Sequence, residues 1–141
     1  MHRTAIAALL FLVGLAPTLG EVRILASPGG DAMAYLKFFS LLNQSGERIV
    51  IDGPCLSACT LLLTEIPRSR VCVTSRAILG FHAAQLVDDH GRKYRAPNAT
   101  HLVEGAYPSA VRSWIERHGG LTSKLILLRG RELAALYPQC R

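Results

Sequence analysis

The sequence predicts a single α/β domain in which parallel strands are layered with helices. Short apolar segments of strand length alternate with segments of helical periodicity between residues 22 and 82, and this alternation is typical of parallel sheets. The strand segment at 49–51 is apolar without alternation, as buried parallel strands tend to be. A chain of 141 residues is also long enough for one small domain with its own core.

Residues 1–20 have the layout of a secretory signal peptide. A basic start at His2 and Arg3 precedes an apolar stretch over 5–15, and small residues follow up to Gly20. The apolar stretch is shorter than a transmembrane helix requires. We expect cleavage after Gly20, with cleavage between 16 and 18 or an uncleaved N-terminal anchor as alternatives. The domain then covers residues 21–141 and works in the periplasm or outside the cell.

The first strand and helix of the domain surround a glycine turn. Residues 22–26 read as an apolar strand that closes on Ser-Pro-Gly-Gly at 27–30. Asp31 is placed to cap a helix over 32–43, whose apolar residues recur at three-residue steps. Gly46 ends this helix.

A second strand and helix follow. The strand at 49–51 leads through Asp52-Gly-Pro to a nearly uniformly apolar stretch from 57 to 66. This stretch predicts a buried helix that Pro67 stops. Ser57 stands at the start of the helix, where serine is a preferred N-cap. Two more apolar strands are expected at 71–73 and 77–82.

The C-terminal part is less regular. The polar stretch 88–98, punctuated by glycine and proline, predicts a loop or flap. Residues 107–117 carry their apolar side chains on one side and predict an amphipathic helix. Thr122 is placed to cap a further helix to about residue 128, and residues 132–136 predict a final short turn.

The cysteines indicate disulfide bonds. Cys55, Cys59, Cys72 and Cys140 all lie in the part expected to be exported. An even number of cysteines in an oxidising compartment indicates disulfides, with three connectivities open. A zinc site is the alternative, but the chain has no paired CxxC knuckles and no histidine at ligand spacing near its cysteines. We therefore expect disulfides, no metal ion and no cofactor.

The positive charge is spread along the chain. The net charge is +6, but there is no dense basic run and no basic strand studded with aromatic residues. Nucleic acid is therefore not an expected partner.

Three features that could do chemistry each follow a predicted strand. They are the glycine pair within 27–30, Ser57 and His82. Each has an ordinary structural interpretation, as a turn, a helix cap and a core histidine. Ligands of open α/β sheets gather at the carboxyl ends of strands, however, and all three features fall at such ends.

Three segments carry a resemblance to a known family. ASPGGDAMAYL, GPCLSACTLLL and SRAILGFHAA, within residues 22–84, resemble the proteolytic subunit of Clp-type proteases and its wider ClpP/crotonase superfamily. The chain looks closest to exported, cysteine-containing ClpP-like proteins of bacteria. The resemblance implies a ClpP/crotonase-like fold in which Ser57 is the nucleophile and His82 the general base. The N–H groups of Gly30 and Ala58 would form the oxyanion hole.

The third catalytic residue of the family is an acid further downstream. Matching the helix end at 118–120 places Glu132 near that position, where Leu133 fits equally well. Asp88 and Asp89 are closer to His82 in sequence but lie in the expected flap.

The resemblance implies an exported serine hydrolase, a peptidase that acts on peptide or protein substrates through an acyl-enzyme. The alternative is a catalytically inactive binding module, in which Ser57 is only a cap and His82 is structural. An acyl-thioester site is disfavoured because coenzyme A is a cytoplasmic cofactor. No ATPase partner is expected outside the cytoplasm. Whether the chain forms a homo-oligomer is left open by the sequence.

On the same resemblance, one disulfide would connect the serine turn to the histidine hairpin. It would join Cys55 or Cys59 to Cys72, and Cys140 would bind the remaining cysteine of that pair.

Overall fold

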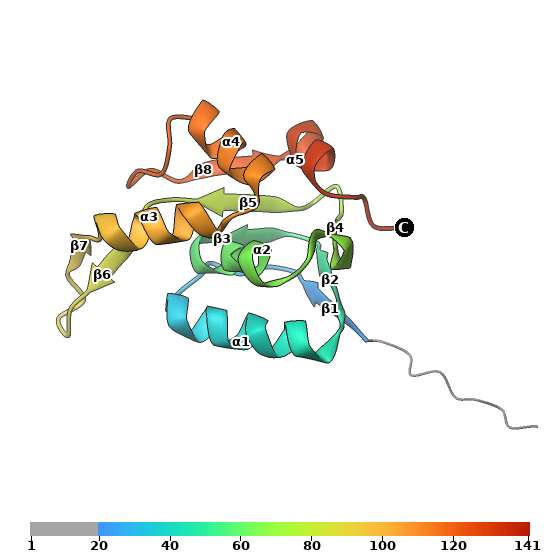
Figure 1. Ribbon diagram of the computed structural model, residues 1–141, viewed down its shortest axis with the longest axis horizontal. Coiled ribbons are helices and arrows are strands. Elements are labelled where there is room, and N and C mark those ends of the chain that lie inside the picture. The colour runs from blue at the N-terminus through green and yellow to red at the C-terminus, as the bar shows by residue number, and fades with distance from the viewer. Residues whose placement is uncertain (1–19) are drawn as a thin grey trace, which may run out of the picture.

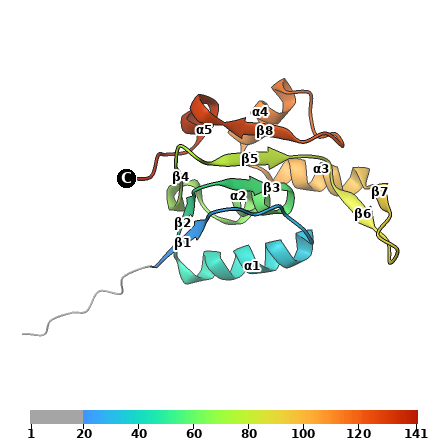
Figure 2. The same cartoon turned by 180° about the vertical axis from the view of Figure 1, so that it is seen from behind.

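The chain forms one mixed α/β domain. The computed structural model describes residues 20–141, so the expected signal peptide lies outside the described residues except for Gly20. Helix α1 (Ala32–Ser45) covers one side of the strand layer, and α4 (Ser109–Arg117) and α5 (Gly130–Leu136) lie on the opposite side (Figure 1). A two-stranded hairpin projects at one end, and the C-terminus lies at the other (Figure 2).

The first sheet is fully parallel, as the sequence predicted. Its strand order is β1 (Glu21–Ile24), β2 (Arg48–Ile51) and β4 (Val71–Val73). Three of the four residues of β2 and all of β4 are buried, which explains why these segments are apolar without alternation. The C-terminal segment then pairs beside β4, through a parallel bridge between Val73 and Gln139.

Both predicted capping residues of α1 are confirmed, and the helix extends to Ser45 rather than to about residue 43. The Asp31 carboxylate accepts a hydrogen bond of 2.7 Å from the N–H of Ala34, which satisfies one of the unpaired amides of the first turn. Gly46 takes the left-handed conformation that ends the helix, with φ 79°.

The second sheet contains a strand that the sequence analysis did not expect. Strand β3 (Pro54–Leu56) pairs in parallel with β5 (Ile78–Phe81), and β5 pairs antiparallel with β8 (Ile126–Arg129). The predicted helix from Thr122 to 128 is therefore wrong. A short apolar run cannot be assigned to helix or strand by periodicity alone, and here the antiparallel pairing with β5 decides it.

The predicted helix over 57–66 is a mixture of two helix types. Residues Ser57–Leu61 form a 3₁₀ turn, η1, and α2 (Leu62–Glu65) continues it, with the extended Ile66 as the C-cap before Pro67. A second short 3₁₀ turn, η2 (Arg68–Arg70), leads into β4.

The expected flap over 88–98 is only partly irregular. Strands β6 (Gln85–Val87) and β7 (Lys93–Arg95) form the projecting hairpin, and α3 (Pro97–Ala106) begins within the stretch. The two strands are exposed along their whole length, so they lack the apolar alternation by which a half-buried strand is recognised. The amphipathic helix predicted over 107–117 is α4, which buries Val111, Trp114 and Ile115.

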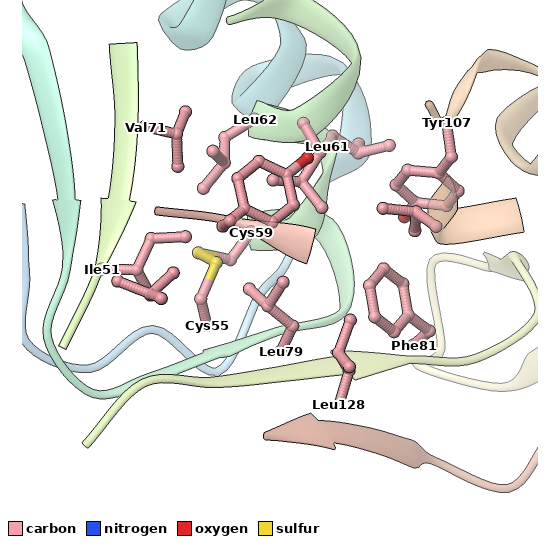
Figure 3. Packing of buried hydrophobic residues seen from close by; sticks show 14 of the residues in the cluster. Ile51, Cys55, Cys59, Leu61, Leu62, Val71, Leu79, Phe81, Tyr107 and Leu128 are labelled. Carbon is pink, nitrogen blue, oxygen red and sulfur yellow. A yellow bond between two sulfur atoms is a disulfide. The ribbon is translucent and has the colours of Figure 1, made fainter. Parts of the chain in front are cut away.

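The hydrophobic core lies around β5 (Figure 3). Leu62, Leu79 and Leu128 have no exposed surface, and Phe81 packs beside them. Full burial of one such side chain contributes about 1.5–3 kcal/mol to folding. The disulfide between Cys55 and Cys59 lies in the same cluster.

Within residues 20–141, no helix combines the length and the apolar character that a membrane span requires.

Candidate active site

Ser57 lies on a sharp turn between β3 and η1. Its φ angle is 54°, and no other residue except glycine has a positive φ in the described range 20–141. Left-handed backbone is unfavourable for a residue with a Cβ atom, and residues held in it cluster at functional sites. The expected role of Ser57 as an N-cap is wrong, because Leu56 occupies that position and no side chain caps η1. The Ser57 hydroxyl has another partner.

That partner is His82, which follows β5. The Oγ atom of Ser57 lies 2.7 Å from Nε2 of His82, and the pair is partly buried. Parallel pairing sets Leu56 beside Gly80, so the chain leaves β3 and β5 at the same edge of the sheet. This distance is within the reach that a general base needs.

The second ring nitrogen of His82 faces a backbone carbonyl. Nδ1 lies 2.7 Å from the carbonyl oxygen of Ala83. Because a carbonyl only accepts hydrogen bonds, Nδ1 carries the proton and Nε2 presents its lone pair to the Ser57 hydroxyl. Ala83 is itself fixed, since its N–H donates to the carbonyl of Thr122 at 2.7 Å. The imidazole is thus oriented without a carboxylate.

The structure does not bring Glu132 to His82. The Glu132 carboxylate lies 3.6 Å from Nε2 of His118 instead. Strand β8 runs antiparallel to β5 and pairs Ile78 with Arg129. Glu132 therefore follows β8 at the amino end of β5, whereas His82 follows its carboxyl end.

The two acids of the hairpin turn also lie apart from His82. Asp88 pairs with the Arg92 guanidinium at 2.7 Å and accepts hydrogen bonds from the N–H groups of Arg92 and His90. The backbone hydrogen bond from Arg92 is the largest cause of a lowered Asp88 pKa. Asp88 therefore organises the β6–β7 turn. Asp89 is exposed in the same turn, and no described carboxylate hydrogen-bonds to His82.

The glycine pair after β1 lies directly against the Ser57 turn. Ser27 joins β3 through two backbone hydrogen bonds, from its N–H to Pro54 at 2.7 Å and from the Leu56 N–H at 2.9 Å. Gly29 follows with φ 85°, and a Cβ atom there would lie 2.6 Å from the Leu56 carbonyl oxygen and 2.7 Å from Cβ of Ser57. Only glycine fits this approach.

Two backbone N–H groups next to Ser57 are free to bind an anion. Ala58 stands in the first turn of η1, where amides lack intrahelical partners. The N–H of Gly30 makes no hydrogen bond within residues 20–141. Gly29, the residue before Gly30, lies directly against Ser57 and Ala58. Both donors therefore come from segments next to the serine, where the carbonyl oxygen of a bound substrate would become an oxyanion.

A buried chain of hydrogen bonds supports the turn. The Thr60 hydroxyl donates to the Ser57 carbonyl at 2.7 Å, and the Tyr107 hydroxyl lies 2.6 Å from the same Thr60 oxygen. Since the Thr60 proton is already used, Tyr107 is the donor. Burial raises the pKa of Tyr107 to about 12, which keeps the phenol protonated. Its ring packs edge-on against Phe81, at 5.3 Å between centroids (Figure 3).

This chain of hydrogen bonds was not predicted from the sequence. Thr60 is one of two threonines in the stretch 57–66 and stands three residues after Ser57. That spacing, at which a threonine hydroxyl can reach the serine carbonyl in a helical turn, is a signal that could have found it. No feature of the sequence relates Tyr107 to Ser57.

All four cysteines form disulfides, with a connectivity different from the expected one. Cys55 bonds to Cys59, and Cys72 bonds to Cys140. The expectation of a bond from the serine turn to Cys72 is wrong because Cys72 lies in β4 of the first sheet, where the C-terminal segment reaches it. The Cys55–Cys59 bond instead spans the Ser57 turn. Two disulfides in so small a domain indicate an oxidising compartment.

No group of three or more histidine, cysteine or acidic residues in the described part of the chain is arranged to hold a metal ion. A scan against protein-family models finds no match to this chain, and a search of the curated proteins finds no significant match.

Proposed function

We propose that this chain is an exported serine hydrolase of the ClpP/crotonase type that cleaves peptides through an acyl-enzyme. The observation that carries the proposal is the 2.7 Å distance between Oγ of Ser57 and Nε2 of His82. The left-handed backbone of Ser57 and the free N–H groups beside it support the same function. Backbone strain at a nucleophile and preorganised oxyanion donors are recurring features of acyl-transfer sites.

The reaction would proceed in two halves. Nε2 of His82 takes the Ser57 proton as Oγ bonds to the peptide carbonyl carbon, and the N–H groups of Gly30 and Ala58 donate to the oxyanion. The tetrahedral intermediate then expels the amine, which takes the proton from His82. Water gives a proton to His82, attacks the ester carbonyl and releases the acid, and Ser57 regains its proton from His82.

The Ala83 carbonyl takes the place of the acid in this site. It holds the tautomer that the reaction requires, as the carboxylate of a Ser-His-Asp triad does. Being uncharged, it stabilises the imidazolium less than a carboxylate would. We therefore expect a slower hydrolase than one with a complete triad.

The two disulfides support export as part of the proposal. Residues 1–20 would be removed as a signal peptide, and the mature chain would begin at Glu21. Intact mass of the protein purified from the periplasm or the medium tests this. A mass that includes residues 1–20 would contradict it.

Labelling with a fluorophosphonate probe tests the activity. The wild type should be labelled at Ser57, and Ser57→Ala and His82→Ala should each abolish labelling, because the probe reacts with a serine activated by a base. Ser109→Ala and His90→Ala, at exposed positions of α4 and the hairpin turn, serve as matched controls and should label as the wild type does. A folded, oxidised wild type that resists the probe would contradict the proposal.

A binding module on the same fold is the second candidate. The observation that favours it is the carbonyl of Ala83 at Nδ1 of His82, where the related hydrolases are expected to carry an acid. In that case His82→Ala would still bind peptides as the wild type does. The fluorophosphonate probe would label neither the wild type nor His82→Ala.

A further inference from the structure

A cavity of about 570 Å³ is lined from Ala83 onward, the residue that follows His82. Its walls come from the segment after His82, from the start of α3 and from the loop before β8. Two hydrogen bonds connect these walls, from the Ala83 N–H to the Thr122 carbonyl at 2.7 Å and from the Ala84 N–H to the Thr100 hydroxyl at 3.0 Å. The cavity is therefore built by the same contacts that fix the Ala83 carbonyl and, through it, the His82 ring.

The charge of the cavity lining is positive. Arg95 of β7 is its charged residue, and no carboxylate lines the cavity. The Arg95 guanidinium has no hydrogen bond or ion pair with another described residue, whereas Arg92 on the same hairpin is paired with Asp88. The first turn of α3 borders the cavity through Pro97 and Thr100, carries no acidic residue and has no side-chain cap, so its dipole adds to the positive field.

The remaining lining leaves room for a ligand beside these donors. Ala83, Ala84 and Ala96 contribute only methyl groups, and Thr122 and Ser123 contribute short polar side chains. A planar guanidinium with free donors at the wall of such a cavity matches a carboxylate, which it can bind through two parallel hydrogen bonds.

We propose that this cavity is a substrate subsite that binds a carboxylate through Arg95, so that peptides with an acidic group near the scissile bond are preferred. This inference rests on the proposed function, because it is the position next to His82 that makes the cavity a substrate subsite. The carboxylate has two sources, an aspartate or glutamate side chain or the C-terminus of a peptide.

Binding to the Ser57→Ala protein tests the subsite without requiring turnover. Four peptides with the same core are compared by isothermal titration, with Glu or Gln at the variable position and with a free or amidated C-terminus. We expect a carboxylate to tighten binding about tenfold or more. The difference between the Glu and Gln peptides measures binding of a side-chain carboxylate. The difference between the free and amidated peptides measures binding of the C-terminal carboxylate.

Charge variants assign the preference to Arg95. Arg95→Gln should remove the difference between carboxylate and amide peptides, and Arg95→Glu should reverse it, so that the amide peptides bind more tightly. Lys93→Gln is the matched control, because Lys93 lies on the same strand but does not line the cavity; it should keep the wild-type preference. Equal binding of all four peptides, or a preference that survives Arg95→Gln, would overturn the subsite. The fluorophosphonate labelling tests the hydrolase proposal independently, because it does not depend on the carboxylate preference.

Discussion

Ser57 combines a strained backbone with a hydroxyl that contacts an imidazole. A positive φ at a residue with a Cβ atom costs on the order of 1–3 kcal/mol, so the surrounding contacts must hold it. The hydrogen bond from Thr60 to the Ser57 carbonyl and the contact with Gly29 are two of them. The strain is therefore shared between the turn and the segments packed around it.

Gly29 packs so closely against the Ser57 turn that a larger side chain there should disturb the turn. In Gly29→Ala the new Cβ atom would meet the Leu56 carbonyl oxygen at 2.6 Å, on a backbone with φ 85°. We expect a loss of about 2 kcal/mol or more in the free energy of unfolding, measured by urea denaturation. Probe labelling should also fall, because the clash displaces Ser57.

Gly91→Ala separates the two causes of that loss. Gly91 has φ 77°, and an added Cβ atom there would have nothing within 4 Å, so this variant has the backbone strain without the clash. It should lose about 1 kcal/mol and keep its labelling. Equal losses in the two variants would show that the contact with the Ser57 turn contributes nothing.

Residue identities could be predicted at this site better than the contacts between them. The resemblance selected Ser57 and His82, which the structure brings within 2.7 Å of each other. The Ala83 carbonyl could not be predicted, because every residue has such a group and only the path of the chain after β5 aims it at Nδ1. Glu132 was selected because its sequence position fits the third catalytic residue of the family. In the structure it follows β8 and lies at the amino end of β5, away from His82.

Element assignments succeeded where a buried pattern or a cap was present. Helix α1 had both, and its two capping residues were predicted correctly. Strand β8 and the β6–β7 hairpin lacked such a buried pattern: β8 is a short apolar run that pairs with β5, and the hairpin is exposed throughout. Pairing between distant segments determines such elements, and local sequence does not record it.

Asp52 connects elements at the carboxyl end of the first sheet. It follows β2, is 4% exposed at its side chain, and accepts hydrogen bonds from Thr74 at 2.6 Å, Arg76 at 2.5 Å and Arg23 at 3.0 Å. The hydrogen bond from Thr74 is the largest cause of a lowered Asp52 pKa, followed by that from Arg76. Together with the bond from Arg23 they lower this pKa from 3.8 to about 2. The ionised carboxylate thus holds β1, β2 and the turn after β4 together.

This pairing predicts a specific loss of stability in acid. Since the pKa is lower in the folded than in the unfolded chain, the ionised form stabilises the fold above about pH 4, and this stabilisation is lost as the pH falls toward 2. Asp52→Asn should lower the free energy of unfolding at pH 7 and flatten its slope between pH 4 and 2, measured by urea denaturation. Asp89→Asn, in the exposed turn, should keep the wild-type slope. The same slope in Asp52→Asn as in the wild type would contradict this role.

The two disulfides act on the molecule at different scales. Cys55 and Cys59 are 4 residues apart and span only the Ser57 turn, whereas Cys72 and Cys140 are 68 residues apart. The longer bond holds the C-terminal segment beside β4, where the Val73 N–H donates to Pro138 at 2.9 Å and the Cys140 N–H donates back to Val73 at 3.0 Å. It therefore covers an edge of the parallel sheet that would otherwise be open to pairing with other chains.

Removal of each disulfide should separate stability from activity. On the loop-entropy model, closing the longer loop stabilises the fold by about 4 kcal/mol and closing the shorter one by about 2 kcal/mol. We therefore expect Cys72→Ala/Cys140→Ala to lose the larger share of the free energy of unfolding, measured by urea denaturation, and to label with the probe while it is folded. Cys55→Ala/Cys59→Ala should lose less stability but more labelling, because its bond spans the residue that reacts. The reverse order, with labelling lost in the first variant and kept in the second, would mean that the C-terminal segment and not the Ser57 turn determines the geometry of the site.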